Sequence, residues 1–425
     1  MSVVHPPSLC TKPSCAAVFA SRATLRLFLR FPIWLAATVV LSLAGCRQPT
    51  LDSQKYAYRE YVYVTNGASN DVTVIDGLNF KSIKTIPVGK NPTGIATNPK
   101  TNEIYVVNTE TNNVSVIDTE KNEVVFTIGV HHLPYFISVS ADGTRGYVAN
   151  SGSNNISIID LHARKVIATV SVGVAPGMAL VSPDGKTVVV TLRGEDAIAV
   201  LDASPQVVQV RSKIPVCKQP GDVVILPDSS KAFVACSGGS QVAAIQLKVA
   251  GTVGDAKRAS NQPASTQPGS SADEDKLLAF LDVGKTPIHL ALKPDGGEIF
   301  VSNFDAGTFS EIASNTNDVG GSYLIGSSPV RGVVANDNAT LYVSNFNSDS
   351  VAVYDITINR LLATVHVGNK PDALALSPNQ NYLFVADTRS GDVAVIRTGV
   401  RALFTMIPVG RKPNALTVKA FAVKK

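Results

Sequence analysis

One short segment is repeated eight times along this chain, and that repetition restricts the fold more than any other feature of the sequence. The first copy, YVYVTNGASNDVTVIDG, spans residues 61–77. Aligned on the residue that follows the Tyr-Val-Thr triplet, successive copies are separated by 42, 42, 42, 44, 67, 42 and 42 residues. The residues in register are Asn66, Asn108, Asn150, Leu192, Cys236, Asn303, Asn345 and Asp387. Such a period indicates a supersecondary unit that is buried only against its neighbours.

Each unit carries the pattern of four β-strands. Short runs rich in Val, Ile, Thr and Tyr alternate apolar and polar residues, as in NEIYVVN, NNVSVID and EVVFTIG (102–108, 112–118 and 123–129), and turn residues separate the runs. A second landmark of the form V-G-x-x-P recurs once per unit. Four strands in about 42 residues are typical of a propeller blade. The sequence therefore predicts an all-β β-propeller of eight four-stranded blades.

The repeats also resemble the YVTN β-propeller repeat family, through the segments YVTN, YVVN, YVAN, YVSN, VTVIDG and TIPVGKNPTG. The resemblance covers residues 58–421 and is specific as to fold but weakly informative as to function. It implies that the strand after each Pro is innermost and that the strand ending in Gly is outermost. One blade would then be closed by the N- and C-terminal strands together, which leaves no free sheet edge at the seam. Many relatives have seven blades, and seven is the alternative here.

The fifth unit is longer than the others. Its extra residues, VAGTVGDAKRASNQPASTQPGSSADED (249–275), are rich in Ser, Pro, Gly and Ala and contain few large apolar side chains. A segment of this composition cannot bury enough surface to offset the entropy lost on ordering. We therefore predict a flexible insertion within a propeller of residues 58–421, followed by a tail at 422–425.

The N-terminus has the features of an export signal. Three arginines precede the apolar run FPIWLAATVVLSLAGC (31–46), as a basic region precedes the hydrophobic region of a signal peptide. The end of the run, LAGC, resembles the bacterial lipobox, which implies lipidation of Cys46. Arg47, in place of Asp, implies sorting to the outer membrane. We expect a lipoprotein signal peptide over 1–45 and a lipid-anchored linker over 46–57, facing the periplasm or the cell surface. An ordinary signal or an uncleaved anchor is the alternative.

The positive charge of the chain lies mainly in that signal. The sequence has 38 basic and 33 acidic residues, and four basic but no acidic residues lie in 1–45. The 34 basic and 33 acidic residues that remain give no electrostatic reason to expect nucleic acid as a partner. The mature chain contains no Walker-type loop, dinucleotide fingerprint, zinc-spaced Cys/His set or G-x-S-x-G elbow. No cofactor is predicted, and haem or a metal is a minor alternative.

Site candidates are sought where the units differ, because residues that every unit shares are needed to build blades. The second residue after the Pro of each V-G-x-x-P loop is expected near the mouth of the central channel, and one unit lengthens this loop to GVHHLPYF (129–136). The predicted ligand-binding residues are His131, His132, Tyr135, Asp222, His289 and Arg331. A metal site is the less favoured interpretation, because the rings of sequence-adjacent histidines usually diverge.

The same loops carry a set of cations, which predicts a basic face on a nearly neutral protein. These residues are Lys90, Lys218, Lys285, Lys370, Arg411 and Lys412. Anionic ligands would be drawn to this face. Single-stranded nucleic acid would also need stacking aromatic side chains, and only Tyr135 and Phe136 are available. No nucleic acid is expected as a partner.

Two classes of function remain open. The first, which we favour, is a non-enzymatic envelope lipoprotein that binds a ligand or partner on the basic face and contacts the membrane only through its lipid. The second is an enzyme or cofactor carrier that resembles lactonase-type or haem-binding propellers. His289 and the His131/His132 loop would be its working groups. The fold alone does not choose between them.

Two cysteines replace two repeat landmarks at once. Cys217 stands for the Gly of one V-G-x-x-P loop, and Cys236 stands at the end of the following YVTN-type strand. The chain between them runs down an innermost strand and back along the next one, so both cysteines finish on the same face. We therefore predict a Cys217–Cys236 disulfide. Two buried free thiols are the alternative.

Overall fold

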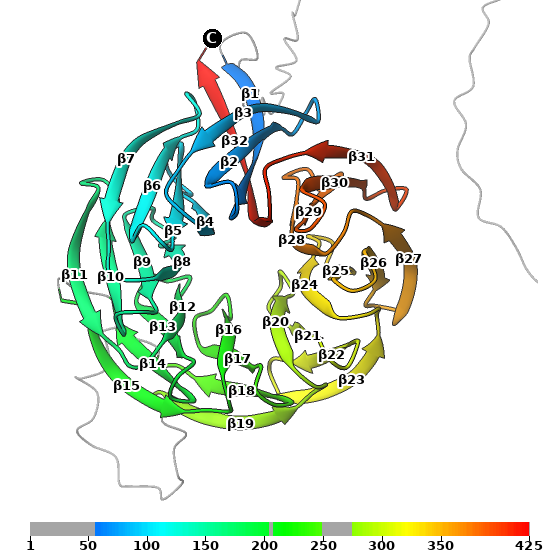
Figure 1. Cartoon of the computed structure of the whole chain (residues 1–425). Helices are drawn as coiled ribbons and strands as arrows, with labels where there is room; N and C mark the ends of the chain where they lie inside the picture. The colour runs from blue at the N-terminus through cyan, green and yellow to red at the C-terminus, as the bar shows by residue number, and fades with distance from the viewer. Residues whose placement is uncertain (1–55, 204–206, 249–273, 425) are drawn as a thin grey trace, which may run out of the picture. The chain divides into compact units, whose positions relative to one another are not determined.

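The computed structural model of the chain describes residues 56–203, 207–248 and 274–424. These residues form eight four-stranded antiparallel sheets, which surround a central axis as the blades of a β-propeller (Figure 1). The predicted fold is confirmed, and the seven-bladed alternative is wrong. Every element in the described ranges is a strand, and no helix able to cross a bilayer is found there.

The strands occupy four positions in each blade. The innermost strands are β4 (Pro92–Thr97), β8 (Pro134–Val139), β12 (Pro176–Val181), β16 (Pro220–Ile225), β20 (Pro287–Leu292), β24 (Pro329–Val334), β28 (Pro371–Leu376) and β32 (Pro413–Lys424). The second strands are β1 (Tyr56–Asn66), β5 (Glu103–Asn108), β9 (Arg145–Asn150), β13 (Thr187–Leu192), β17 (Lys231–Cys236), β21 (Glu298–Asn303), β25 (Thr340–Asn345) and β29 (Tyr382–Asp387). The third strands are β2 (Asp71–Asp76), β6 (Asn113–Asp118), β10 (Asn155–Asp160), β14 (Ala197–Asp202), β18 (Gln241–Gln246), β22 (Thr308–Ala313), β26 (Ser350–Asp355) and β30 (Asp392–Arg397). The outermost strands are β3 (Lys81–Pro87), β7 (Glu123–Gly129), β11 (Lys165–Ser171), β15 (Gln209–Pro215), β19 (Lys276–Asp282), β23 (Asp318–Leu324), β27 (Arg360–His366) and β31 (Ala402–Pro408).

The middle strands are buried on both faces because each blade is sandwiched between two others. In β5 every residue after the first is buried, and β6 has four consecutive buried residues. The outermost strand of the same blade, β7, is mostly exposed. Strands covered on both faces need continuous apolar runs, which explains the Val- and Ile-rich segments that recur in every unit.

Eight apolar clusters hold the blades together, and each cluster lies between two neighbouring sheets. In one of them Tyr63 and Val74 of the first blade pack with Ile104 and Ile117 of the next. A blade buries its apolar faces only when both neighbours are present. A ring of eight such clusters therefore makes the fold interdependent around its circumference.

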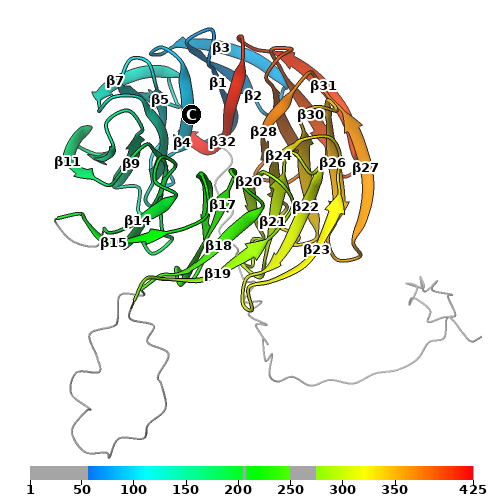
Figure 2. The ribbon, with the colours of Figure 1, turned by 60° about the horizontal axis from the view of Figure 1, so that its bottom comes forward.

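The ring is closed by the two ends of the propeller. Strand β32 pairs with β1 in an antiparallel register from Tyr56↔Lys424 to Asn66↔Pro413, and the two strands lie side by side in both views (Figure 1, Figure 2). This closure confirms the predicted strand order. The strands are longer than expected, however, because the pairing continues through residues 56–57 and 422–424. Residues 422–424 are therefore part of a strand and not of a tail.

Some predictions fall outside the described residues. These are the signal peptide (1–45), the lipidation of Cys46, most of the linker (46–57) and the insertion up to residue 273. The end of the insertion is described and corrects its predicted extent. Asp275 accepts hydrogen bonds from Arg211 Nε and Nη2, both at 2.7 Å, and from Ser212 Oγ at 2.8 Å. Asp275 therefore belongs to the ordered blade and not to the insertion, because this ion pair fixes its carboxylate against β15.

The disulfide between Cys217 and Cys236 is present, with the two Cα atoms 5.6 Å apart. It joins the loop before β16 to the end of β17, within one blade. Cys236 is fully buried. The disulfide that was predicted from the replacement of two repeat landmarks by cysteine is therefore confirmed.

Candidate functional site

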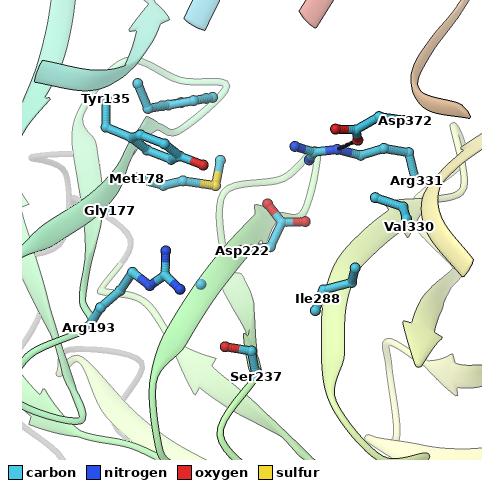
Figure 3. Close-up of a pocket in the computed structure, with 12 residues that line it drawn as sticks. Tyr135, Gly177, Met178, Arg193, Asp222, Ser237, Ile288, Val330, Arg331 and Asp372 are labelled. Atoms are coloured by element: carbon cyan, nitrogen blue, oxygen red, sulfur yellow. Dashed lines mark ion pairs between the residues drawn. The ribbon is translucent and has the colours of Figure 1, made fainter. Parts of the chain in front are cut away.

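A small cavity opens at the mouth of the central channel, and we call it the mouth cavity. Its volume is about 260 Å³. The residues that line it are Tyr135, Phe136, Gly177, Met178, Arg193, Gly221, Asp222, Ser237, Ile288, Val330, Arg331 and Asp372 (Figure 3). They come from innermost strands of several blades and from the loops after two second strands. The cavity is therefore a product of the ring and not of any single blade.

A bulge at the start of each innermost strand explains why two successive residues reach the channel. In β16 the pairing with β17 shifts between Pro220 and Asp222, so Gly221 is left out of the register. The same shift follows the Pro of β20 and of β24. A bulge places two residues opposite one on the partner strand. The first and second residues after the Pro therefore both line the cavity, as Val330 and Arg331 do.

Asp222 and His289 form a buried ion pair behind the cavity wall. Asp222 Oδ2 lies 2.7 Å from His289 Nδ1 and accepts the backbone N–H of Leu290 at 2.8 Å. The other ring nitrogen, Nε2, lies 3.1 Å from the carbonyl oxygen of Gly332. Both ring nitrogens of His289 therefore have polar partners within the protein.

The carboxyl group of Asp222 is correspondingly held in its charged form. Burial would raise its pKa, but the positive His289 beside it, with help from Arg331 and the Leu290 N–H, brings the pKa below its ordinary value. Asp222 is 5% exposed. A buried carboxylate at this depth persists only because it is paired and hydrogen-bonded.

Arg331 lies beside the Asp222–His289 pair and forms an ion pair with Asp372. Its Nε lies 3.5 Å from Asp372 Oδ1, and its Nη1 lies 3.4 Å from His289 Nδ1. Burial would lower the pKa of the guanidinium, but the carboxylates of Asp372 and Asp222 outweigh burial and raise that pKa. Arg331 is therefore compensated by carboxylates that lie beside it.

Arg193 lies on the opposite side of the mouth cavity from Arg331 (Figure 3). It is exposed, and its guanidinium makes no hydrogen bond or ion pair with any described side chain, unlike Arg331. Arg193 follows β13, the second strand of its blade, which ends in Leu192. Most blades have Asn at the position of Leu192. Arg193 therefore gives the cavity one uncompensated positive charge.

The structure brings together four of the predicted site residues and separates the other two. Tyr135 and Arg331 line the mouth cavity with Asp222, and His289 supports Asp222 from behind. His131 and His132 do not line it. His131 Nε2 lies 3.0 Å from Thr169 Oγ1 on the outermost strand β11.

The backbone explains this correction. The loop that holds both histidines leaves β7, an outermost strand, and crosses to β8, an innermost strand. His132 is held by its backbone N–H, which donates to Ser153 Oγ at 2.8 Å. Only the part of the loop next to Pro134 reaches the channel. The two added residues therefore enlarge the loop away from the cavity.

The predicted basic face has the expected position. All six cations lie in the loops before innermost strands, and Lys90, Lys218, Lys285, Arg411 and Lys412 are exposed. Lys370 is partly withdrawn, since its Nζ donates to Asn347 Oδ1 at 2.6 Å and lies 5.0 Å from the centre of the Phe346 ring. Lys285 lies 4.0 Å from the carboxylate of Asp305, and Arg411 donates to the Ala68 carbonyl at 3.2 Å. None of the six cations lines the mouth cavity.

Neither a metal nor haem fits the described residues of this site. No group of three or more His, Cys, Asp or Glu with metal-binding geometry occurs in the described ranges. Both ring nitrogens of His289 are already engaged, so this histidine cannot serve as an axial ligand. The mouth cavity, at about 260 Å³, is also smaller than the roughly 300–1,000 Å³ of sites for drug-sized ligands.

Comparison with protein families gives one match. A model for the seven-bladed β-propeller lactonases matches residues 327–401. This segment includes Arg331 and Asp372 but is a minor part of the chain. Among curated proteins, no significant match was found.

Comparison with solved structures gives many propellers. Dihydro-heme d1 dehydrogenase NirN in complex with DHE is 15% identical, with a TM-score of 0.68 over 84% of this chain and 74% of its own. AztD from Citrobacter koseri is 15% identical, with a TM-score of 0.61 over 87% of this chain and 100% of its own. Hydrazine synthase from Kuenenia stuttgartiensis is 22% identical, with a TM-score of 0.52 over 80% of this chain and 92% of its own. Identities this low establish the fold alone.

Proposed function

We propose that this chain is an exported, lipid-anchored and non-enzymatic protein that binds a small carboxylate at the mouth cavity. The observation that carries the proposal is the unpaired guanidinium of Arg193. Asp222 contacts His289 and Arg331 contacts Asp372, whereas Arg193 has no such partner among the described residues. One positive charge is thus left for a ligand, and a guanidinium matches the geometry of a carboxylate.

The rest of the lining suits a small organic anion better than an inorganic one. Phe136, Met178, Ile288 and Val330 supply apolar surface on the cavity wall. Ligand sites commonly combine such surface with a few placed polar groups. The five exposed cations around the cavity would raise the local concentration of anions and so speed their association.

Binding without catalysis is favoured by the state of His289. A general base needs a ring nitrogen that can reach the substrate, and both nitrogens of His289 already contact protein groups, Asp222 and the Gly332 carbonyl. Lactone hydrolysis is nevertheless a second candidate, because the lactonase family match includes Arg331 and Asp372. Incubation with a panel of five- and six-membered lactones, followed by pH-stat titration, tests it. Acid release above the buffer rate would favour the enzyme.

The binding function is tested by calorimetry on the full-length exported protein purified in detergent, with hexanoate as the probe. Arg193→Gln is expected to weaken binding about tenfold or more, since a charge-assisted contact contributes roughly 1.5–3 kcal/mol. Arg389→Gln is the matched control, because Arg389 is an exposed arginine in a loop of another blade. Equal losses in both variants, or no binding by the unmodified protein, would refute the proposal.

The lipid anchor has its own test. Cys46→Ala protein is expected to lose its partitioning into the detergent phase of a phase-separation assay, because Cys46 would carry the acyl chains. Fractionation of the unmodified protein should place it in the outer membrane. Partitioning that is unchanged in the variant would contradict lipidation.

A further inference from the structure

Two carboxylate oxygens at the mouth cavity have unused capacity to accept hydrogen bonds. Asp372 Oδ1 is buried and accepts no hydrogen bond from any described residue, although Arg331 Nε is 3.5 Å away as an ion-pair partner. Asp222 accepts its hydrogen bonds through Oδ2. Its Oδ1 has no hydrogen-bond donor among the described residues, and the carboxylate points toward the cavity (Figure 3). Asp372 Oδ1 is thus a buried acceptor without a donor, which is rare in folded proteins and needs an explanation.

A ligand that donates hydrogen bonds would satisfy these oxygens. The required donor could be a hydroxyl group or an ammonium group, and the charge of the cavity separates the two. Both carboxylates already lie beside the guanidinium of Arg331. An ammonium would bring a further positive charge next to Arg331, in a site whose Arg193 is also unpaired. A neutral hydroxyl adds no charge and makes a strong bond to a carboxylate.

We propose that the mouth cavity selects small hydroxy acids, with the carboxylate of the ligand on Arg193 and a hydroxyl at its far end on Asp372 and Asp222. The inference rests on the proposed function and names the ligand class of that same site. Figure 3 places Arg193 and Asp372 on opposite sides of the cavity with Asp222 between them. Different side chains would therefore bind the two ends of the ligand.

The size of the cavity limits the length of the ligand. At roughly 30 Å³ for each water-sized group, a volume of about 260 Å³ admits about eight or nine non-hydrogen atoms. A six-carbon acid with one terminal hydroxyl has that size. The methylene groups between its ends would contact Met178 and Ile288.

Three acids that differ only in their last group test the inference on the unmodified protein. The probes are hexanoate, 6-hydroxyhexanoate and 6-aminohexanoate, measured by calorimetry at one ionic strength. We expect 6-hydroxyhexanoate to bind about tenfold more tightly than hexanoate, because a hydroxyl bond to a charged acceptor is gained. We expect 6-aminohexanoate to bind no more tightly than hexanoate.

Two variants identify the side chains that read the hydroxyl. In Asp372→Ala the preference for 6-hydroxyhexanoate over hexanoate is expected to fall below about threefold. Asp372→Asn keeps the shape of the side chain, guards against a folding defect and should also reduce the preference. Asp305→Ala removes an exposed carboxylate outside the cavity and should leave the preference unchanged.

The outcomes separate this inference from the proposed function. Equal affinities for hexanoate and 6-hydroxyhexanoate, both weakened by Arg193→Gln, would overturn the hydroxyl assignment and leave carboxylate binding intact. Tightest binding of 6-aminohexanoate would overturn the charge argument. Absence of binding by all three acids would overturn both proposals.

Discussion

Asn66 and Asp387 occupy the same position in two adjacent blades, at the end of the second strand, yet they are stabilised in opposite ways. Both are fully buried. Asn66 Nδ2 donates to Asp71 Oδ1 at 2.7 Å and to Thr73 Oγ1 at 2.8 Å. Asp387 also meets an acid five residues further on, Asp392. We call the end of the second strand, together with the start of the third, the corner of a blade. The corner at Asn66 pairs a donor with an acceptor, and the corner at Asp387 pairs two carboxyl groups.

The second corner favours the protonated form of Asp387 at neutral pH. Burial and the neighbouring Asp392 raise the pKa of Asp387 to about 8, and N–H groups of the backbone offset only part of this rise. Gly368 N donates to Asp387 Oδ2 at 3.1 Å, whereas Oδ1 is buried and accepts nothing from the described residues. A proton on Oδ1 can be donated to Asp392. In these two blades an amide supplies a donor at every pH, whereas a carboxyl group supplies one only below its pKa.

The blade that contains the Cys217–Cys236 disulfide has a third form of this corner. Removal of the disulfide should have the largest effect on stability. A double variant, Cys217→Ala with Cys236→Ala, loses the covalent link that closes a loop with a sequence separation of 19. We expect the free energy of unfolding to fall by about 3 kcal/mol, because the unfolded chain regains the entropy of that loop. Urea denaturation measures the change.

Reductant provides the control for this prediction. Dithiothreitol should destabilise the unmodified protein toward the value of the double variant and leave the variant itself unchanged. If the two proteins unfold at the same urea concentration without reductant, the disulfide does not contribute to the free energy of unfolding.

Asp387→Asn should convert the acid corner into a copy of the Asn66 corner. The unfolded carboxyl titrates near pH 3.9, and the folded one near pH 8. The native state therefore binds more protons than the unfolded state between these values, so native stability falls as the pH rises through this range. The difference between the two pKa values sets an upper limit of about 5 kcal/mol on this loss at pH 8. We expect the variant to be about 2 kcal/mol more stable at pH 8, because the native corner can relax as Asp387 ionises, and nearly unchanged at pH 4. Thermal unfolding across this range measures both.

The mirror substitution, Asn66→Asp, sharpens the comparison. It places an acid beside Asp71 and should create the pH dependence that Asp387→Asn removes. Its destabilisation should be greater at pH 8 than at pH 4. If neither variant changes the pH dependence of unfolding, then the charge state of this corner does not affect stability.

The sequence predicted the parts of the molecule that depend on period. Eight blades, the closing strands and the order within each blade follow from residues such as Asn66 and Asp387 standing in register. The disulfide was also predictable, because Cys217 and Cys236 changed two landmarks together. These features depend on the repeated pattern, which can be recognised even where single residues of one copy differ.

The site was predicted only in part because its details are local. The register placed Asp222, His289 and Arg331 near the channel, and the structure brings them together. It did not reveal that a bulge turns the preceding residue inward as well, so Asp372 was missed. Arg193 was missed although its blade departs from the Asn pattern at Leu192. The direction of an enlarged loop is not encoded in its length, which is why the two-histidine loop was misplaced.

The smallest expected effect separates the two causes of the raised pKa of Asp387. In Asp392→Asn the neighbouring charge is removed and replaced by an amide that can donate to Asp387, whereas the burial of Asp387 is kept. Burial is the larger cause, so the pKa should fall only part of the way toward its ordinary value. We expect a gain of about 1 kcal/mol in the free energy of unfolding at pH 8, about half that of Asp387→Asn. The pH dependence should persist with its upper limit moved to lower pH, because the native state still binds the additional proton at intermediate pH. A gain equal to that of Asp387→Asn, with no remaining pH dependence, would instead assign the whole shift to the pair of acids and none to burial.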